Sequence, residues 1–398
     1  MSSERLANFE QFAIDVILER RKGKRANLLR AGLWFLSGAF RAVVQTRLWL
    51  YRTRVLKSTS PGCLVISIGN LTLGGTGKTP VVELLARSLQ DAGRRVAILS
   101  RGYKAKKPPI LRRLQRKWLG MDYRKTRVVH DGERLLLDSS VAGDEPFMLA
   151  RSLRNVVVLV DKNRVRAALS AVRSFGCDTL LLDDGMQYAS LRRRIEICLI
   201  DRQAPFGNEH LLPRGTLREP PANLRRASYI FITKSEGADN TALIQRIRGF
   251  NQTAGIIECT HKPLHLINLY TKEELPLSWL KGRHIGALSG IARPESFEEK
   301  LTDLGAELHI TARFADHHRF SPKELNHFIS RCVRRDLDAV VTTEKDSVRF
   351  PHRAPSSDVP VLFLRVEIEI LRGQEVWENL MRQVCAPPAM RLPELVLA

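Results

Sequence analysis

Residues 69–80 read Gly-Asn-Leu-Thr-Leu-Gly-Gly-Thr-Gly-Lys-Thr-Pro, between an apolar run at 63–68 and a helical pattern at 79–92. The stretch matches the phosphate-binding pattern G-x-x-x-x-G-K-[ST] except at its first position, where Thr72 replaces glycine. Three glycines in four residues let backbone N–H groups converge on phosphate oxygens, and the helix start adds its dipole. The alternative, a tight glycine turn with an incidental lysine, is disfavoured by the strand-loop-helix setting. The predicted nucleotide-binding residues are Thr72, Leu73, Gly74, Gly75, Thr76, Gly77, Lys78 and Thr79.

A second motif supplies acids for a metal ion. The apolar residues 179–182 run directly into Asp183 and Asp184. A phosphate-binding loop needs a carboxylate at the end of a neighbouring strand to organise Mg²⁺. We therefore predict that Asp183, Asp184 and the hydroxyl of Thr79 bind Mg²⁺, while Lys78 contacts the β- and γ-phosphates of a nucleotide. Two adjacent acids could instead cap the next helix.

The pattern around these motifs alternates short apolar runs with helical segments, which is typical of a parallel sheet covered on both faces. Continuous apolar runs occur at 96–99, 156–160, 195–200 and 229–232, with helical patterns at 144–153 and 163–175. A second series, with runs at 284–288, 307–310, 339–341 and 361–366 and helices at 294–304 and 321–334, starts near residue 280. We predict an α/β fold with a three-layer P-loop core at 61–264 and a smaller C-terminal α/β domain within 265–398. Residues 259–281 are the candidate linker.

Charge points to an anionic partner. The 398 residues carry a net charge of +22, and residues 1–60 and 101–130 supply 18 of those charges. A composition of 44% hydrophobic and 27% charged residues excludes a mostly disordered chain. The six cysteines are at least 21 residues apart, which argues against a disulfide framework or a CxxC zinc site. Since we find no secretory signal and no apolar run long enough to span a bilayer, we expect a cytosolic body.

Residues 1–60 are predicted to form amphipathic membrane-associating helices. In the segment 26–57, apolar residues recur at helical spacing, Trp34 and Trp49 add aromatic rings, and Arg30, Arg41 and Arg52 fall nearly in line. Such a helix suits a membrane interface. A surface helix packed on its own domain with a solvated basic face is the alternative. The basic segment 104–127 could be a lid over a phosphorylated ligand or a solvated insertion.

The ordered motifs resemble the tetraacyldisaccharide 4'-kinase family, the lipid A 4'-kinases. The resemblance covers about residues 26–370 and is carried by the stretches 69–80, 100–103, 143–146, 182–185, 206–208, 211–213, 217–220, 316–320 and 343–346. It implies transfer of the γ-phosphate of ATP, with Mg²⁺, to the 4'-hydroxyl of an acylated glucosamine disaccharide 1-phosphate. It also implies that the reaction takes place at the cytoplasmic face of the bacterial inner membrane, in lipid A biosynthesis. The resemblance also favours the membrane-interfacial interpretation of the helix at 26–57.

The resemblance also implies site residues. Asp144 matches the general base, Glu145 lies beside it at the metal, and His317 matches the histidine that pairs with the base across the domain cleft. Arg218 and Glu219 match residues near the substrate and nucleotide phosphates, and Gln187 is expected on the substrate side. Without the family, Asp144 would be read as a helix N-cap, the Asp-His-His run as a turn or a metal pair, and 343–346 as a capping box.

The chain departs from the family pattern in places. Tyr188 stands where the family usually has histidine, residues 104–127 are unusually basic, and residues 1–25 extend beyond the typical start. Two other classes compete with a lipid kinase. A nucleic-acid-dependent P-loop ATPase would explain the charge, but we recognise no helicase or RNA-binding signature and expect no nucleic-acid partner. A nucleotide-switched binding protein would hydrolyse ATP without forming a phosphorylated product.

Overall fold

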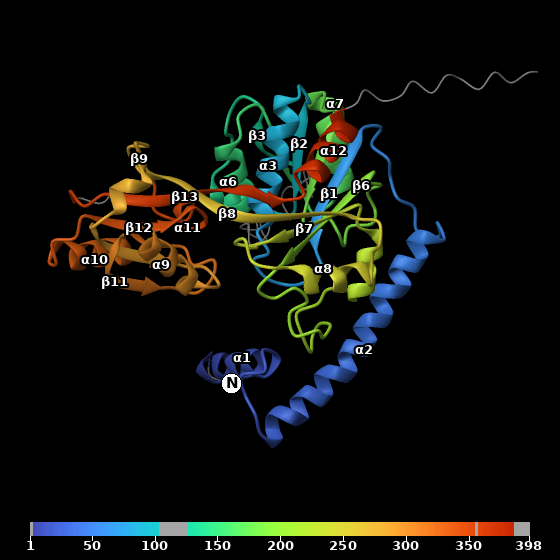
Figure 1. The fold of residues 1–398 in the computed structure, drawn as a ribbon, viewed down its shortest axis with the longest axis horizontal. Coiled ribbons are helices and arrows are strands. Elements are labelled where there is room, and N and C mark those ends of the chain that lie inside the picture. The colour runs from blue at the N-terminus through green and yellow to red at the C-terminus, as the bar shows by residue number, and fades with distance from the viewer. Residues whose placement is uncertain (1–2, 103–125, 355–356, 386–398) are drawn as a thin grey trace, which may run out of the picture.

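One continuous sheet of 13 strands runs through the computed structural model (Figure 1). The structure describes residues 3–102, 126–354 and 357–385, so most of the basic segment 104–127 lies outside the described residues. Twelve strands are neighbours in the order β11-β10-β12-β13-β8-β7-β6-β1-β5-β2-β4-β3, and β9 pairs with β8 off this path. The first and second halves of the chain therefore share a sheet instead of forming two separate ones.

The central part of the sheet is parallel. Its strands are β1 (Leu64–Asn70), β2 (Val96–Ser100), β4 (Val157–Val160), β5 (Thr179–Asp183), β6 (Ile195–Asp201) and β7 (Tyr229–Thr233). The edge strand β3 (Arg127–Asp131) runs antiparallel to β4. Because the parallel strands end at the same edge, the loops after β1, β2 and β5 are brought together there.

Helices cover both faces of this part, as predicted for a three-layer fold. On β1, Ile66 and Ile68 belong to one buried cluster and Val65 to another, because successive side chains point to opposite faces. The first face packs against α3 (Lys78–Asp91), α6 (Asp144–Ser152) and the C-terminal α12 (Gln374–Cys385). The other face packs against α7 (Arg164–Phe175) and, over β6 and β7, against η1 (Pro221–Arg226) and α8 (Thr241–Arg248).

The second half repeats the layered plan on a smaller scale. Its parallel strands are β10 (His284–Ser289), β11 (Glu307–Arg313) and β12 (Ala339–Thr343). One face packs against α10 (Pro322–Val333), and the other packs against α9 (Pro294–Asp303). A capping box in which Ser321 and Glu324 satisfy each other's backbone N–H groups starts α10. The short α11 (Glu344–Ser347) follows β12.

Two long strands join the halves. The strand β8 (Gly255–Asn268) begins parallel to β7 and continues antiparallel to β13 (Val361–Arg372), which itself begins parallel to β12. The candidate linker at 259–281 is therefore largely strand, with β8 followed by β9 (Glu274–Pro276) and η2 (Leu277–Leu280). The predicted division into 1–60, 61–264 and 265–398 stays a prediction, and its second boundary falls inside β8.

Two helices precede the sheet. They are α1 (Ser3–Ile17) and α2 (Lys24–Arg52), which extends beside the body of the protein (Figure 1). Near its middle, Ser37 is buried, donates from Oγ to the carbonyl of Leu211 over 2.8 Å and accepts from the N–H of Arg214 over 3.1 Å. Large apolar side chains point to solvent along this helix: Leu28, Trp34, Phe35, Leu36, Val43 and Trp49. Among the described residues, no helix is long and apolar enough to cross a membrane.

Candidate active site

The glycine-rich loop joins β1 to α3, and its last residue has a conformation that favours glycine. Gly77 caps α3 with φ of 76°. A Cβ at this position would also come within 2.8 Å of the imidazole of His261 on β8. Lys78 and Thr79 are therefore the first residues of α3, where the helix dipole favours an anion.

Strand β7 holds the outside of this loop. The hydroxyl of Thr233 donates to the carbonyl of Thr76 over 2.9 Å, and Nζ of Lys234 donates to the carbonyl of Gly75 over 3.0 Å. The N–H of Leu73 donates to the carbonyl of Thr216 over 2.7 Å. Two loop carbonyls and the N–H of Leu73 therefore fasten the loop to neighbouring segments, so the protein itself holds the loop in shape.

Lys78 reaches from α3 to two polar partners at the ends of neighbouring strands. Its Nζ lies 3.2 Å from Oδ1 of Asn70 and 3.6 Å from Oδ1 of Asp184. Asp184 also accepts from Nη1 of Arg218, with both carboxylate oxygens at 2.8 Å. The predicted phosphate-binding lysine therefore lies beside one of the predicted metal-binding acids.

The carboxylates of Asp183, Asp184 and Glu145 repel one another at this strand end. Burial, followed by the charges of Glu145 and Asp184, raises the pKa of Asp183 to about 7. Burial also acts against ionisation of Asp184, but Lys78 and Arg218 outweigh it and lower the pKa of that carboxyl. The charge of Lys78 only partly offsets the effect of burial and of the two acidic neighbours on Asp183, so the residues fit Mg²⁺ bound among oxygen ligands.

The three predicted substrate-side residues divide into two groups. Gln187 joins the acidic end of β5, because its side-chain oxygen accepts from Arg218 over 3.2 Å and its amide donates to the carbonyl of Asn70 over 3.0 Å. Glu219 is buried and instead faces η1, where its carboxylate accepts from Asn223 over 2.7 Å and pairs with Arg226 at 2.9 Å. Arg218 and Gln187 therefore lie together, whereas Glu219 is held by a separate set of partners.

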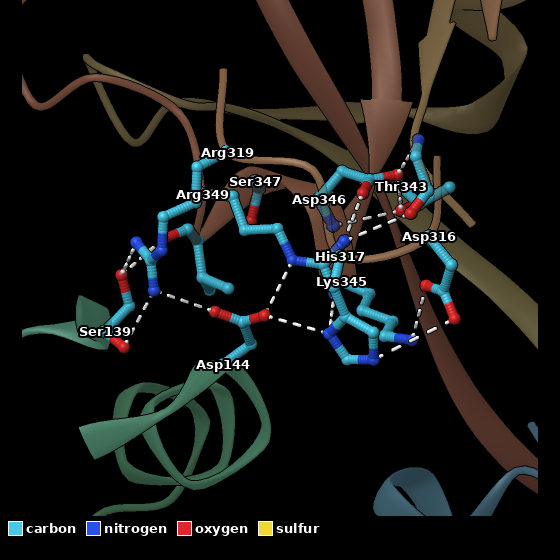
Figure 2. A network of polar contacts seen from close by, with 12 residues as sticks. Ser139, Asp144, Asp316, His317, Arg319, Thr343, Lys345, Asp346, Ser347 and Arg349 are labelled. Carbon is cyan, nitrogen blue, oxygen red and sulfur yellow. Dashed lines mark hydrogen bonds and ion pairs between the residues drawn. The ribbon is translucent and has the colours of Figure 1, made fainter. Parts of the chain in front are cut away.

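Asp144 and His317 meet across the two halves of the molecule (Figure 2). Asp144 is the first residue of α6, and His317 lies in the loop after β11 with φ of 69°. Nδ1 of His317 lies 3.1 Å from Oδ2 of Asp144, although 173 positions separate the residues. Burial opposes the charge of Asp144, but the hydrogen bond from His317 and the guanidinium groups of Arg349 and Arg319 prevail and lower its pKa.

Two arginines complete this network (Figure 2). Nε of Arg349 donates to Oδ2 of Asp144 over 2.8 Å, and Nη2 of Arg319 donates to Oδ1 over 3.0 Å. Arg319 also donates to the carbonyl of Ser139 over 2.9 Å, in the short helix α5 (Ser139–Ala142) that precedes α6. The Asp144 carboxylate therefore has partners on both oxygens, all from the second half of the chain.

Comparisons with known proteins point to a kinase family. The family model described as tetraacyldisaccharide-1-P 4'-kinase matches residues 29–385. The tetraacyldisaccharide 4'-kinase of Anaeromyxobacter dehalogenans strain 2CP-C is 40% identical, over 90% of this chain and 91% of the relative. That of Syntrophus aciditrophicus is 36% identical, over 87% of this chain and 90% of the relative.

The chain belongs to the tetraacyldisaccharide-1-phosphate 4'-kinase family.

A solved structure of this family shares the fold. LpxK from Aquifex aeolicus, crystallised in complex with ATP, superposes with a TM-score of 0.69 at 28% identity. The match covers 89% of this chain and 99% of that chain. The predicted family, the α/β fold class and the ATP-dependent lipid kinase activity with ATP and Mg²⁺ are therefore confirmed. The predicted class of acceptor, a lipid A disaccharide 1-phosphate, agrees with the family.

The stretch 343–346, which is one of the kinase family's motifs, has the structural role that its spacing predicts. Thr343 caps α11 by accepting from the N–H of Asp346 over 3.1 Å, as capping-box spacing predicts.

Tyr188, which replaces the family's histidine, positions Arg164. Its Oη accepts from the backbone N–H of Arg164 over 3.0 Å, and the guanidinium stacks over its ring at 5.1 Å. Arg164 in turn donates to the carbonyl of Asp183 over 3.4 Å.

Sequence reasoning missed Arg319 and Arg349 as neighbours of the kinase's predicted base. Arg319 lies inside the family motif at 316–320, so the motif could be recognised in the sequence, but the contact of Arg319 with Asp144 could not. Arg349 lies three residues after Asp346 and pairs with it, a spacing that brings side chains together on one helical turn. That spacing was the available signal. It could not show that Arg349 also reaches Asp144, because that contact depends on how the halves pack.

Proposed function

We propose that Asp144 is the general base of this kinase and that His317 orients it, so that the γ-phosphate of ATP passes to the 4'-hydroxyl of a tetraacyldisaccharide 1-phosphate. The observation that carries the proposal is the 3.1 Å contact between Nδ1 of His317 and Oδ2 of Asp144. A sugar hydroxyl is a weak nucleophile, so a carboxylate must accept its proton as the new P–O bond forms. Asp144 is ionised and held by named partners, as that role requires.

The phosphate side of the reaction belongs to the loop 72–79. Backbone N–H groups of this loop and Lys78 hold the phosphates, and the start of α3 adds its dipole. Thr79, Glu145, Asp183 and Asp184 would hold Mg²⁺. When bound, the ion spreads the negative charge that develops on the transferred phosphoryl group.

The acceptor side is assigned to Arg218, Gln187 and Glu219. Arg218 and Gln187 lie at the acidic end of β5, beside Lys78. A guanidinium there can form a bidentate contact with a phosphate of either substrate. Glu219 pairs with Asn223 and Arg226 of η1 and is proposed to fix the backbone next to Arg218 through these contacts.

The catalytic carboxylate and histidine belong to different halves of the chain. The contact between the two halves is proposed to exclude water when both substrates are bound, because the pair of Asp144 and His317 is complete only when the halves meet. Exclusion of water favours transfer to the sugar over hydrolysis of ATP. The same contact then serves both alignment and selectivity.

The N-terminal helices are proposed to place the enzyme at the cytoplasmic face of the inner membrane. Trp34 and Phe35 are 66% and 75% exposed on α2. Apolar surface of this kind is typical of a binding face. Arg41 and Arg52 are exposed on the same helix and suit anionic headgroups. The proposed membrane localisation is supported by these exposed apolar and basic side chains of α2 and by the lipid nature of the acceptor.

The experiment is transfer of label from γ-labelled ATP to a tetraacylated disaccharide 1-phosphate in mixed micelles. We expect a labelled lipid product that depends on Mg²⁺. Lys78→Ala should abolish it, whereas Lys323→Ala, at an exposed position of α10, should leave the rate unchanged. Hydrolysis of ATP with no labelled lipid would contradict the proposal and favour a nucleotide-switched protein.

A further inference from the structure

Arg349 is a completely buried arginine at the junction of the two halves. Its side chain has 0% exposure and lies between two carboxylates, Asp144 of α6 and Asp346 of α11. A guanidinium buried this deeply is stable only if its charge and most of its N–H groups are matched. The partners of Arg349 therefore decide its role.

Four hydrogen-bonding contacts surround the guanidinium (Figure 2). Nε donates to Oδ2 of Asp144 over 2.8 Å, and Nη1 donates to Oδ1 of Asp346 over 2.8 Å and to the carbonyl of Gly290 over 3.1 Å. Nη2 lies 3.0 Å from Nδ1 of His317. Asp346 is itself anchored, because it accepts from the N–H of Gly290 over 2.9 Å. Arg349 is thus fixed in the second half and reaches across to Asp144.

Nδ1 of His317 has two competing partners. It lies 3.1 Å from Oδ2 of Asp144 and 3.0 Å from Nη2 of Arg349. A ring nitrogen either carries a proton and donates or has a lone pair and accepts. When Nδ1 donates to Asp144 it cannot accept from Arg349, so the arginine influences which nitrogen of His317 carries the proton.

We infer that Arg349 is the positioning residue of the Asp144–His317 pair. It fixes Oδ2 of Asp144 from the second half and holds His317 beside it, which leaves Oδ1 as the oxygen that faces the acceptor hydroxyl. Oδ1 accepts a hydrogen bond from Arg319, whose side chain is 39% exposed and so more easily displaced. The inference rests on the proposed role of Asp144 and adds a residue that acts through it.

A double-mutant cycle separates positioning from simple stabilisation. The variants are Asp144→Asn, Arg349→Lys and the double variant, each assayed for kcat and for the KM of ATP at saturating lipid acceptor. Lysine keeps the charge between Asp144 and Asp346, but its single nitrogen cannot reach the three oxygen acceptors on Asp144, Asp346 and Gly290 in the geometry of a guanidinium. We expect Arg349→Lys to lower kcat by about tenfold or more and to leave the KM of ATP within about twofold.

The same substitution should cost little once the base is gone. In the Asp144→Asn background, Arg349→Lys should lower kcat by no more than about twofold, because residues that act as a unit are strongly non-additive. An equal loss in both backgrounds, or a kcat within about twofold of wild type for Arg349→Lys, would overturn the inference. Arg349→Gln, checked for folding by circular dichroism, should show a larger loss than lysine.

Two controls keep the outcomes distinct. Arg334→Ala removes an exposed arginine of the same half, whose Nε contacts the carbonyl of Ser330 on its own helix, and should leave kcat unchanged. If Asp144→Asn itself retains wild-type turnover, the proposed base is wrong. If Asp144→Asn is nearly inactive while Arg349→Lys is fully active, the base stands and the inference about Arg349 fails.

Discussion

Arg365 on β13 forms a buried ion pair with Glu83 on α3, the helix that begins at the phosphate-binding loop. The same guanidinium pairs with Glu344 on α11 and lies 3.4 Å from the hydroxyl of Ser152 on α6. Three helices from both halves of the chain therefore meet at one arginine. Because both carboxylates are buried, neither is compensated by water when the arginine is removed.

Arg365→Met should accordingly lower the free energy of unfolding by about 3–5 kcal/mol, because it removes the ion pair of the buried Glu344 and leaves the buried Glu83 only its pair with the exposed Arg87. Urea unfolding followed by circular dichroism measures this change. The matched control is Arg372→Met on the same strand, an exposed arginine 3.7 Å from Glu258, with an expected loss of about 1 kcal/mol or less. Equal losses for the two variants would contradict the prediction.

The half-buried imidazole of His261 predicts a pH dependence of stability. Burial, followed by the charge of Lys234, lowers its pKa to about 4, whereas the unfolded chain has a value near 6.5. Between these values the unfolded state binds more protons, so stability is full above about pH 6.5 and is lost as pH falls towards 4. His261→Gln should show a shallower loss over this window in unfolding curves at several pH values. Parallel curves for both proteins would contradict this assignment.

Replacing Trp34 and Phe35 by serine should weaken sedimentation with anionic liposomes by about tenfold or more, because burying each ring contributes on the order of 2 kcal/mol. The binding of ATP should not change, since these side chains point away from the body of the protein. Serine substitutions at Leu135 and Leu136, which are 43% and 50% exposed elsewhere on the molecule, provide the control. Deletion of residues 1–57 should have the larger effect, and unchanged partitioning would refute an interfacial α2.

Asp144→Ala should lower turnover by orders of magnitude and leave the affinity for ATP largely intact, because the phosphate loop is held by β7 and not by Asp144. Equilibrium binding of a fluorescent ATP analogue and the labelled transfer assay measure the two properties separately. Turnover within a few-fold of wild type would show that another group accepts the proton.

Local patterns predicted much of this fold. Continuous apolar runs identified β1, β5 and β6, since a strand buried on both faces needs no alternation, and glycine spacing identified the loop before α3. The long strand β8 escaped prediction as a strand. Its second half is mostly half-buried, with Lys262 exposed and Leu266 buried, and its sequence mixes polar and apolar residues, so it lacks the continuous apolar signature of a central strand.

The site was predictable where its residues share a motif and not where it depends on packing between distant segments. Lys78, Asp183 and Asp184 follow from strand ends that must lie at one sheet edge. The pair Asp144 and His317 was expected because of family resemblance. The approach of Arg349 to Asp144 spans 205 positions and two packed halves, and no local spacing encodes it.

The loop after β6 connects two surfaces of the enzyme. Leu211 contacts Ser37 of α2, and Arg218, seven residues later, contacts Asp184 at the acidic strand end. Seven residues extend over at most about 25 Å, so α2 and the reacting centre are separated by no more than that length of chain. If α2 lies in the membrane interface, as proposed, the acceptor can keep its acyl chains in the bilayer and present only its sugar. Collisions then occur in two dimensions, and the rate should follow the mole fraction of acceptor in the surface more closely than its bulk concentration.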